Sequence, residues 1–352
     1  MIEFFSGLVA VLMWLPFSLV GLTQELYLNL SNQPLSETIE PGVVFSFKQA
    51  ENLGLNPRAT FLAMLEDLKP KSLRAIAYWD RVEKVDDEFD FSELDFQLQE
   101  AEKRNIKTTL IIGEKVPRWP ECHYPGWLSL AQSDEKRQEE VLEYLQTVVN
   151  RYKNYPQLEF WQLENEPSLA FGKCPGFNKK AFEQKLKLLK SLSEKPVMVT
   201  TSGELDTWLR AFLYGDKIGF SVYRRFFVSL PSLAGLSFKR VGLNYPLPPE
   251  FYKAKSDFYG LAFKKQTMVT EFQLEPWLDK NLKDASFEEQ FKELDFEDFK
   301  NQIEYARKIG VQRVYFWGTE WWYWLKQNNH PEFLDYVQRE VFNLSLDSEK
   351  DN

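Results

Sequence analysis

The stretch Phe160-Trp161-Gln162-Leu163-Glu164-Asn165-Glu166-Pro167 is an apolar run that ends in polar, acidic residues. Apolar residues recur at helical spacing before it, in residues 141–149, and after it, in residues 182–192. A near-continuous apolar run between two amphipathic helices is typical of a parallel strand that is buried on both faces. The stretch therefore predicts a strand within an α/β protein, with Glu166 just beyond the end of that strand.

The same alternation occurs eight times along the chain. The apolar runs are Val43–Phe47, Leu73–Trp79, Thr108–Ile112, Leu158–Leu163, Val197–Thr201, Ile218–Tyr223, Thr267–Val269 and Val311–Trp317. Eight units of this kind favour a single (β/α)8 TIM barrel over an open doubly wound sheet, and the chain has no Gly-x-Gly-x-x-Gly loop. We assign residues 42–345 to this barrel, with a linker over 23–41 and a polar tail over 346–352.

An apolar segment precedes the predicted barrel. Residues 4–22 carry no charge, and these 19 residues are just long enough to span a bilayer as a helix. We expect residues 1–22 to form a signal anchor or, as the second interpretation, a cleaved signal peptide, although a positive n-region and an Ala-x-Ala site are missing. An apolar tail that packs on the barrel is the third interpretation. Either export signal would predict an extracytoplasmic protein, membrane-anchored or secreted.

The composition excludes several classes of function. The chain has 352 residues, 44% of them hydrophobic, which is enough for one large core. Its net charge of -9 would repel a polyanion, so we expect no nucleic-acid partner. His123 and His330 are the only histidines, which argues against a histidine-based triad or a multi-histidine metal site. The oligomeric state is left open.

The two cysteines have more than one interpretation. Cys122, His123 and Cys174 could supply three zinc ligands, but they lack the paired short spacing of zinc sites, so we predict no metal and no cofactor. The cysteines fall in the predicted loops after strands three and four, where a disulfide could join them in an oxidising compartment. Two unrelated buried thiols are the alternative.

Two glutamates close predicted strands. Glu166 follows the fourth run, and Glu271 follows Met268-Val269-Thr270 in the seventh. An ionised carboxylate is costly in such a place unless it is paired or used. The C-terminal strand ends of a barrel meet at one mouth, where two carboxyl groups could together cleave a glycosidic bond. Taken singly, Asn-Glu-Pro is also a helix-start signal, and Glu271 could be a surface acid.

With these residues in place, the chain resembles a retaining glycoside hydrolase of clan A, the barrel superfamily with catalytic glutamates on strands four and seven. Asn165-Glu166-Pro167 matches the Asn-Glu-Pro motif of the clan, and Thr270-Glu271-Phe272 resembles its nucleophile segment. The resemblance implies that Glu166 is the acid/base and that Glu271 is the nucleophile. It also implies that Asn165 binds the sugar 2-hydroxyl.

Further matches lie on other predicted strands. Arg74 resembles the clan arginine that hydrogen-bonds the nucleophile, and Tyr223 resembles its aromatic partner. Trp317 resembles the platform beneath the sugar. Without the resemblance, the alternative is that Arg74 neutralises a structural acid, although a guanidinium inside a barrel needs a carboxylate partner in any case.

Other acidic residues near strand ends compete with these two. Glu114 follows the third run and could bind sugar hydroxyls, or form a salt bridge to Lys115 or Arg118. Glu164 lies two residues before Glu166, on the same face of the pleat, so we expect it to sit deeper or to act as support.

Aromatic residues indicate the class of ligand. Trp119 and Trp277 follow strand ends, where flat rings can stack on sugars, while many of the other tryptophans are expected in the core. Residues 117–127 and 224–249 are the expected walls of the site. The sequence thus predicts a hydrolase of β-linked oligo- or polysaccharides that retains the anomeric configuration. A membrane-tethered transglycosylase and a non-catalytic carbohydrate-binding barrel are the alternatives.

Overall fold

The computed structural model describes residues 39–128, 133–231 and 238–343, with the backbone alone over 226–244. The expected signal segment, nearly all of the linker and the tail lie outside the described residues. Within the described ranges, no helix combines the length and the apolar character needed to cross a membrane. The first strand begins at Glu40, two residues before the expected start of the barrel.

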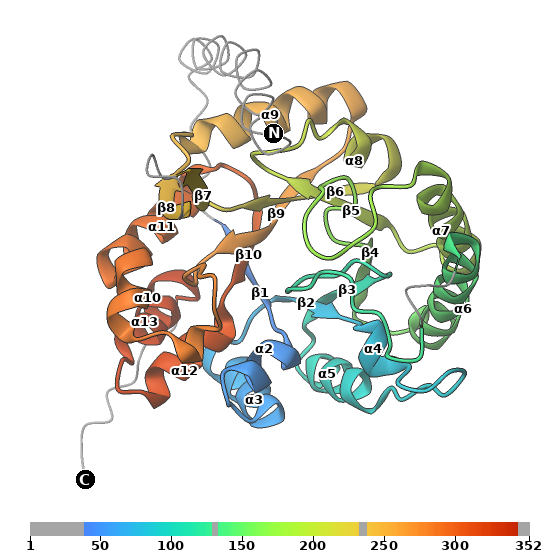
Figure 1. Cartoon of the computed structure of the whole chain (residues 1–352), viewed down its shortest axis with the longest axis horizontal. Helices are drawn as coiled ribbons and strands as arrows, with labels where there is room; N and C mark the ends of the chain where they lie inside the picture. The colour runs from blue at the N-terminus through green and yellow to red at the C-terminus, as the bar shows by residue number, and fades with distance from the viewer. Residues whose placement is uncertain (1–38, 129–132, 232–237, 344–352) are drawn as a thin grey trace.

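Eight parallel strands close into a barrel at the centre of the molecule (Figure 1). Their order around the barrel is β1 (Glu40–Val44), β10 (Arg313–Trp317), β9 (Thr267–Gln273), β6 (Lys217–Val222), β5 (Val197–Ser202), β4 (Leu158–Leu163), β3 (Lys107–Ile112) and β2 (Ser72–Ile76). Each strand overlaps one of the eight predicted runs. The predicted fold class, a single (β/α)8 barrel, is confirmed.

Helices surround the barrel in Figure 1. Several begin at a polar residue that accepts a hydrogen bond from the backbone three residues later, as Ser133 does from Lys136 and Asn178 from Ala181. The α-helices are α2 (Phe47–Asn52), α3 (Pro57–Leu68), α4 (Trp79–Val82), α5 (Ser92–Lys103), α6 (Asp134–Tyr152), α7 (Lys179–Leu192), α8 (Leu209–Tyr214), α9 (Pro249–Phe263), α10 (Phe287–Glu293), α11 (Phe296–Lys308), α12 (Thr319–Gln327) and α13 (Glu332–Tyr336). The chain also forms the 3-10 helix η1 (Leu282–Asp284) and the π-helix η2 (Val337–Val341).

The apolar core has two parts. A small cluster that includes Ile111, Phe160, Met198 and Tyr315 belongs to the strands and their ends. A much larger cluster joins the strands to the surrounding helices. Strands that contribute to both clusters are apolar on both faces, which explains why they read as continuous apolar runs.

The seventh strand of the barrel differs from its prediction. The apolar run ends at Val269, but β9 continues to Gln273, so Glu271 lies within the strand. Phe220 on β6 pairs with Val269 while its neighbour Ser221 pairs with Glu271, so Thr270 is an extra residue in β9. Such a bulge changes the direction of the side chains that follow it. The bulge therefore sets the orientation of Glu271.

Three further features concern segments around the strand ends. Residues 224–249, expected to be a wall of the site, contain an antiparallel hairpin of β7 (Arg225–Pro231) and β8 (Phe238–Asn244). Phe47 and Trp79, placed at strand ends by the sequence, instead begin α2 and α4. Both side chains are buried members of the large apolar cluster between the strands and the helices.

Candidate active site

Arg74 connects the residues that the sequence singled out. This arginine lies fully buried on β2, and its Nη1 donates to Glu271 Oε1 at 2.7 Å. Its Nη2 donates to Asn165 Oδ1 at 2.8 Å, and its Nε donates to Gln162 Oε1 at 2.7 Å. Nη1 also reaches the carbonyl of the bulge residue Thr270 at 3.3 Å. A buried guanidinium requires partners of this kind, and here it binds β4 and β9 together.

Glu271 is a buried carboxylate with two hydrogen-bond donors. Arg74 contacts Oε1, and the hydroxyl of Tyr223 donates to Oε2 at 2.9 Å. Burial first, and then the charge of Glu271, raise the pKa of Tyr223 well above its usual value, so its hydroxyl keeps its proton and donates. Both oxygens of Glu271 accept hydrogen bonds, which suits a carboxylate anion.

Glu166 is held in an unusual backbone conformation. Its φ of 43° is left-handed, a region that residues other than glycine seldom adopt. The surroundings fix this conformation, because its N–H donates to Thr200 Oγ1 at 2.8 Å and its carbonyl accepts from Lys115 Nζ at 2.9 Å. The hydroxyl of Ser221 donates to Glu166 Oε1 at 2.5 Å. The side chain is thereby aimed toward β6.

The two glutamates influence one another. Burial first, and then the negative charge of Glu271, raise the pKa of Glu166 to about 8, while the Ser221 hydrogen bond and the charge of Lys115 act in the opposite direction. Ser221 bonds to Glu166 and pairs in register with Glu271 on the adjacent strand. The structure thus brings the predicted pair together, and the raised pKa of Glu166 favours its protonated form at neutral pH.

Trp317 has a different environment from the one expected of a sugar platform. It ends β10 and is 6% exposed. The guanidinium of Arg118 lies 3.9 Å from the centre of its ring, and its Nε1 donates to Glu275 Oε1 at 2.8 Å. Arg118 also pairs with Glu275 and with Glu320. A sugar would have to use the ring face that Arg118 leaves open, so the platform role of Trp317 stays a prediction.

Glu114 lies in a buried ion network. Its Oε1 accepts from Lys185 Nζ at 2.8 Å, and its Oε2 accepts from the hydroxyl of Tyr124 at 2.6 Å. Lys185 also pairs with Glu164. A salt bridge was one of the two interpretations of Glu114, but its partners are Lys185 on α7 and Arg137 on α6, and neither Lys115 nor Arg118 pairs with it. Glu164 supports this network, but it lies beyond the end of β4 with a left-handed φ of 59°, so the prediction that it shares a pleat face with Glu166 is wrong.

Aromatic side chains extend from Tyr223 toward solvent. The ring centre of Trp277 lies 5.6 Å from that of Tyr223 and 5.7 Å from that of Phe171. Phe171 is in turn 6.1 Å from Trp119, which is 61% exposed. The structure therefore brings together both tryptophans that the sequence proposed for stacking. Phe171 was missed because it follows no apolar run.

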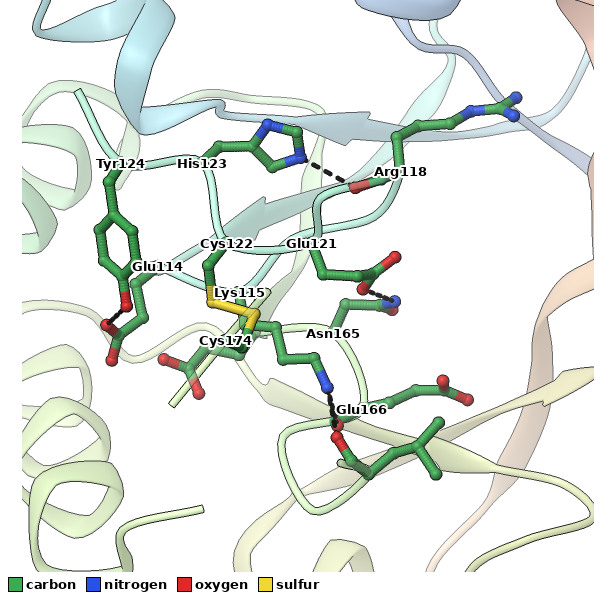
Figure 2. Close-up of a disulfide and its surroundings, with 12 residues drawn as sticks. Glu114, Lys115, Arg118, Glu121, Cys122, His123, Tyr124, Asn165, Glu166 and Cys174 are labelled. Carbon is green, nitrogen blue, oxygen red and sulfur yellow. Dashed lines mark hydrogen bonds between the residues drawn. A yellow bond between two sulfur atoms is a disulfide. The ribbon is translucent and has the colours of Figure 1, made fainter. Parts of the chain in front are cut away.

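The loop after β3 is tied to the loop after β4. The predicted disulfide between Cys122 and Cys174 is present, with Cα atoms 5.3 Å apart (Figure 2). Neither cysteine is a free thiol, which removes two ligands from the zinc alternative. Glu121, next to Cys122, is buried and lies beside Asn165. Sequence reasoning missed this glutamate because no strand or motif marks it.

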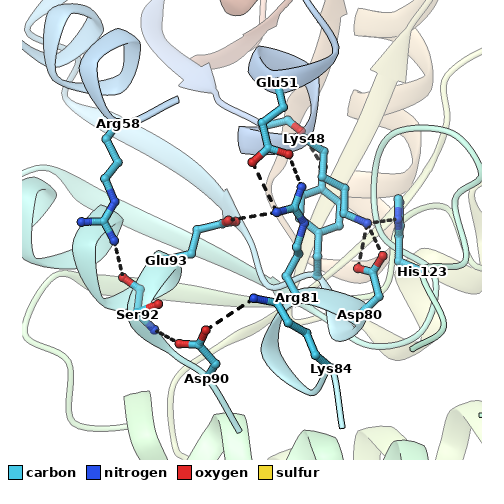
Figure 3. Close-up of polar contacts among 12 residues, drawn as sticks. Lys48, Glu51, Arg58, Asp80, Arg81, Lys84, Asp90, Ser92, Glu93 and His123 are labelled. Atoms are coloured by element: carbon cyan, nitrogen blue, oxygen red, sulfur yellow. Dashed lines mark hydrogen bonds and ion pairs between the residues drawn. The ribbon is translucent and has the colours of Figure 1, made fainter. Parts of the chain in front are cut away.

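His123 anchors the other side of the same loop. Its Nδ1 lies 2.8 Å from Lys48 Nζ, which also binds Asp80 at 2.7 Å (Figure 3). Its Nε2 lies 3.0 Å from the carbonyl oxygen of Arg118. Burial and the charge of Lys48 lower the pKa of His123 to about 4, so the ring is neutral at physiological pH. These contacts give His123 a structural role.

No family model and no curated protein sequence matches the chain. Solved structures do match in fold. GH5_18 from Streptomyces cattleya in complex with GlcNAc has a TM-score of 0.52 at 10% identity, covering 80% of this chain and 70% of its own. Xylanase 10B from Thermotoga maritima has a TM-score of 0.51 at 14% identity, covering 80% and 83%. A variant of GH5_18 from Bifidobacterium longum in complex with Manb1-4GlcNAc has a TM-score of 0.55 at 10% identity, covering 79% and 68%.

These matches have sequence identities too low to transfer an activity, but they agree on the architecture. The similarity to clan A glycoside hydrolases is confirmed at the level of the fold: the chain shares the (β/α)8 barrel of these enzymes.

Proposed function

We propose that the protein is a glycoside hydrolase that cleaves a β-linked oligo- or polysaccharide with retention of the anomeric configuration. One observation carries the proposal: Glu271 accepts hydrogen bonds at both oxygens, while the nearby Glu166 has a pKa raised to about 8. One carboxyl group is therefore arranged as an anion and the other as an acid. These are the two states that the first step of a retaining hydrolase needs.

The reaction proceeds in two steps on this arrangement. Glu271 attacks the anomeric carbon while Glu166 gives its proton to the leaving oxygen, which forms a glycosyl-enzyme ester on Glu271. Glu166, now an anion, takes a proton from water, and the resulting hydroxide displaces the sugar from Glu271. Arg74 and Tyr223 orient Glu271 for the attack. In the second step their hydrogen bonds stabilise the carboxylate that Glu271 becomes as the leaving group. Glu166 thus gives up one proton in the first step and regains one from water in the second.

The substrate class follows from the surroundings of the pair. Tyr223, Trp277, Phe171 and Trp119 form a continuous series of rings, and such rings bind the apolar faces of pyranoses. Two of the similar structures are complexes with GlcNAc and with Manb1-4GlcNAc, which supports a carbohydrate ligand here. Substrates with several sugar units would make use of the whole series.

The setting of the reaction is a further part of the proposal. The disulfide suits an oxidising compartment, and residues 4–22 are long enough for a membrane segment. We therefore place the enzyme outside the cytoplasm, anchored or secreted. A transglycosylase would use the same two glutamates and differ in its acceptor.

Turnover of a panel of aryl β-glycosides and of β-glucan and β-mannan oligosaccharides tests the proposal, with the product anomer followed by NMR. We expect the β-anomer to form first. Glu271→Gln should abolish turnover, while Glu140→Gln on α6, outside the site, should not. An α-anomer as the first product would contradict retention. Absence of turnover with every substrate of the panel would contradict the proposal that the protein is a glycoside hydrolase.

A further inference from the structure

Glu121 is a third carboxyl group at the candidate active site. It lies in the loop after β3, is 7% exposed and points toward Asn165 (Figure 2). Asn165 Nδ2 donates to Glu121 Oε2 at 3.4 Å. The two-step reaction proposed above gives Glu121 no part, although its carboxyl group lies next to Asn165, to which the family resemblance gives a sugar-binding role.

The position of Glu121 is closely constrained. Its N–H donates to the carbonyl of Arg118 at 2.7 Å, and its carbonyl accepts from Val116 N at 2.8 Å. The next residue forms the disulfide to the loop after β4. In that loop Gly172 has a φ of 83°, and a Cβ there would lie 2.6 Å from Glu121 Cβ and from the carbonyl oxygen of Pro120. Only glycine allows the two loops to approach so closely.

The buried surroundings of Glu121 favour its neutral form. Burial first, and then the negative charge of Glu271, raise its pKa well above the usual range. Glu166 adds to this effect when it is ionised, whereas Lys115 and the Asn165 hydrogen bond oppose it. A neutral carboxyl group has one O–H donor and an acceptor oxygen, so it can bond to a hydroxyl group in either sense.

The amide of Asn165 locates the part of the sugar that Glu121 would meet. Its oxygen is occupied by Arg74, which leaves Nδ2 for a ligand, and in this structure Nδ2 points at Glu121. The resemblance to clan A implies that Asn165 binds the sugar 2-hydroxyl, so under the proposed function Nδ2 would face the substituent on C2, the carbon next to the anomeric centre. A group on C2 that reaches Nδ2 therefore also comes within reach of the Glu121 carboxyl.

Resting on the proposed function, we infer that Glu121 is a specificity-determining residue: it hydrogen-bonds the substituent on C2 and selects sugars with a hydroxyl or amine there. A site with buried polar groups discriminates strongly against an analogue that leaves them unpaired. The two loops joined by the disulfide thus supply a selectivity element that the catalytic pair lacks.

The test is a comparison of two substrates across several variants. The best-hydrolysed aryl β-glycoside and its 2-deoxy analogue are assayed, and the 2-deoxy penalty is the ratio of their kcat/KM values. Glu121→Ala should lower this penalty about tenfold, as expected for the loss of one hydrogen bond at a buried site. Glu121→Met, which keeps the volume, should do the same, so a failure of the alanine variant to fold does not decide the matter.

The remaining arms separate recognition from a structural effect. Glu121→Gln can still hydrogen-bond a hydroxyl and should keep most of the penalty, and Glu140→Met on α6 should keep all of it. A 2-deoxy penalty in Glu121→Met equal to that of the wild type would overturn the inference while leaving the proposed function intact. A wild-type protein that hydrolyses no substrate of the panel would overturn both.

Discussion

The hydroxyl of Ser221 donates to Glu166 Oε1 at 2.5 Å, and the backbone of Ser221 pairs in register with Glu271. One serine thus contacts the proposed acid and neighbours the proposed nucleophile. Its hydrogen bond lowers the pKa of Glu166 against the larger, opposing effects of burial and of Glu271. The serine therefore limits how far that pKa rises.

Ser221→Ala should raise the pKa of Glu166 further, because the hydrogen bond that favours its anion is lost. Since Glu166 must be protonated to act as the acid, the alkaline limb of the kcat/KM profile should move to higher pH. A pH series on an unactivated substrate measures this shift. If the alkaline limb moved to lower pH instead, a group other than Glu166 would determine the pH at which activity is lost.

Glu166→Gln should change the pH dependence of stability. The pKa of Glu166 is raised in the folded protein to about 8 from an unfolded value near 4.5, so folding holds its proton more tightly and wild-type stability falls as pH rises between these values. Glutamine has no proton to lose and removes this fall. Thermal melts at pH 5 and pH 9 should show the variant gaining on the wild type at the higher pH. An equal difference at both values would contradict the raised pKa.

Arg74→Met should be strongly destabilising. It leaves Glu271 as a buried charge without its cation, and breaking such a pair costs about 3–5 kcal/mol. The double variant Arg74→Met with Glu271→Gln should recover part of that loss, because the uncompensated charge is removed. Denaturant unfolding measures both variants. If the double variant is no more stable than the single one, the charge of Glu271 is not what Arg74 balances.

Trp119→Ala should separate binding of long substrates from chemistry. The ring is 61% exposed, so stability should hardly change, whereas kcat/KM for oligosaccharides should fall by roughly fivefold, or about 1 kcal/mol. An aryl monosaccharide should be hydrolysed as before. Trp208→Ala provides the contrast in stability. That tryptophan is fully buried, so its loss should cost about 3–5 kcal/mol of stability. Equal losses on short and long substrates would exclude a role in subsite binding.

The sequence was sufficient to predict the barrel, because strands buried on both faces leave continuous apolar runs. It also predicted the pairing of Arg74 with Glu271, since a buried guanidinium and a buried carboxylate each need the other. The extra residue Thr270 in β9 leaves no comparable sign, because a bulge is defined by the partner strand. From the sequence alone we therefore expected Glu271 at a strand end, whereas it lies within β9, after the bulge.

Contacts between distant loops and helices were harder to predict. Lys185 pairs with Glu114 from a helix 71 residues later in the chain. Arg118 covers a face of Trp317 because its loop folds back over the strand ends. Glu121 depends on a left-handed backbone and on a disulfide-linked neighbour. Such positions follow from how loops pack, which no local pattern encodes.

Mass spectrometry of Glu166→Gln mixed with a dinitrophenyl β-glycoside tests the central claim most directly. The activated leaving group needs little protonation, so Glu271 should be glycosylated, and the ester should accumulate because the base for its hydrolysis is missing. Peptide mapping should find one sugar on Glu271, and azide, which needs no base, should restore turnover. A sugar on another residue, or turnover with no covalent intermediate and an inverted product, would contradict the account.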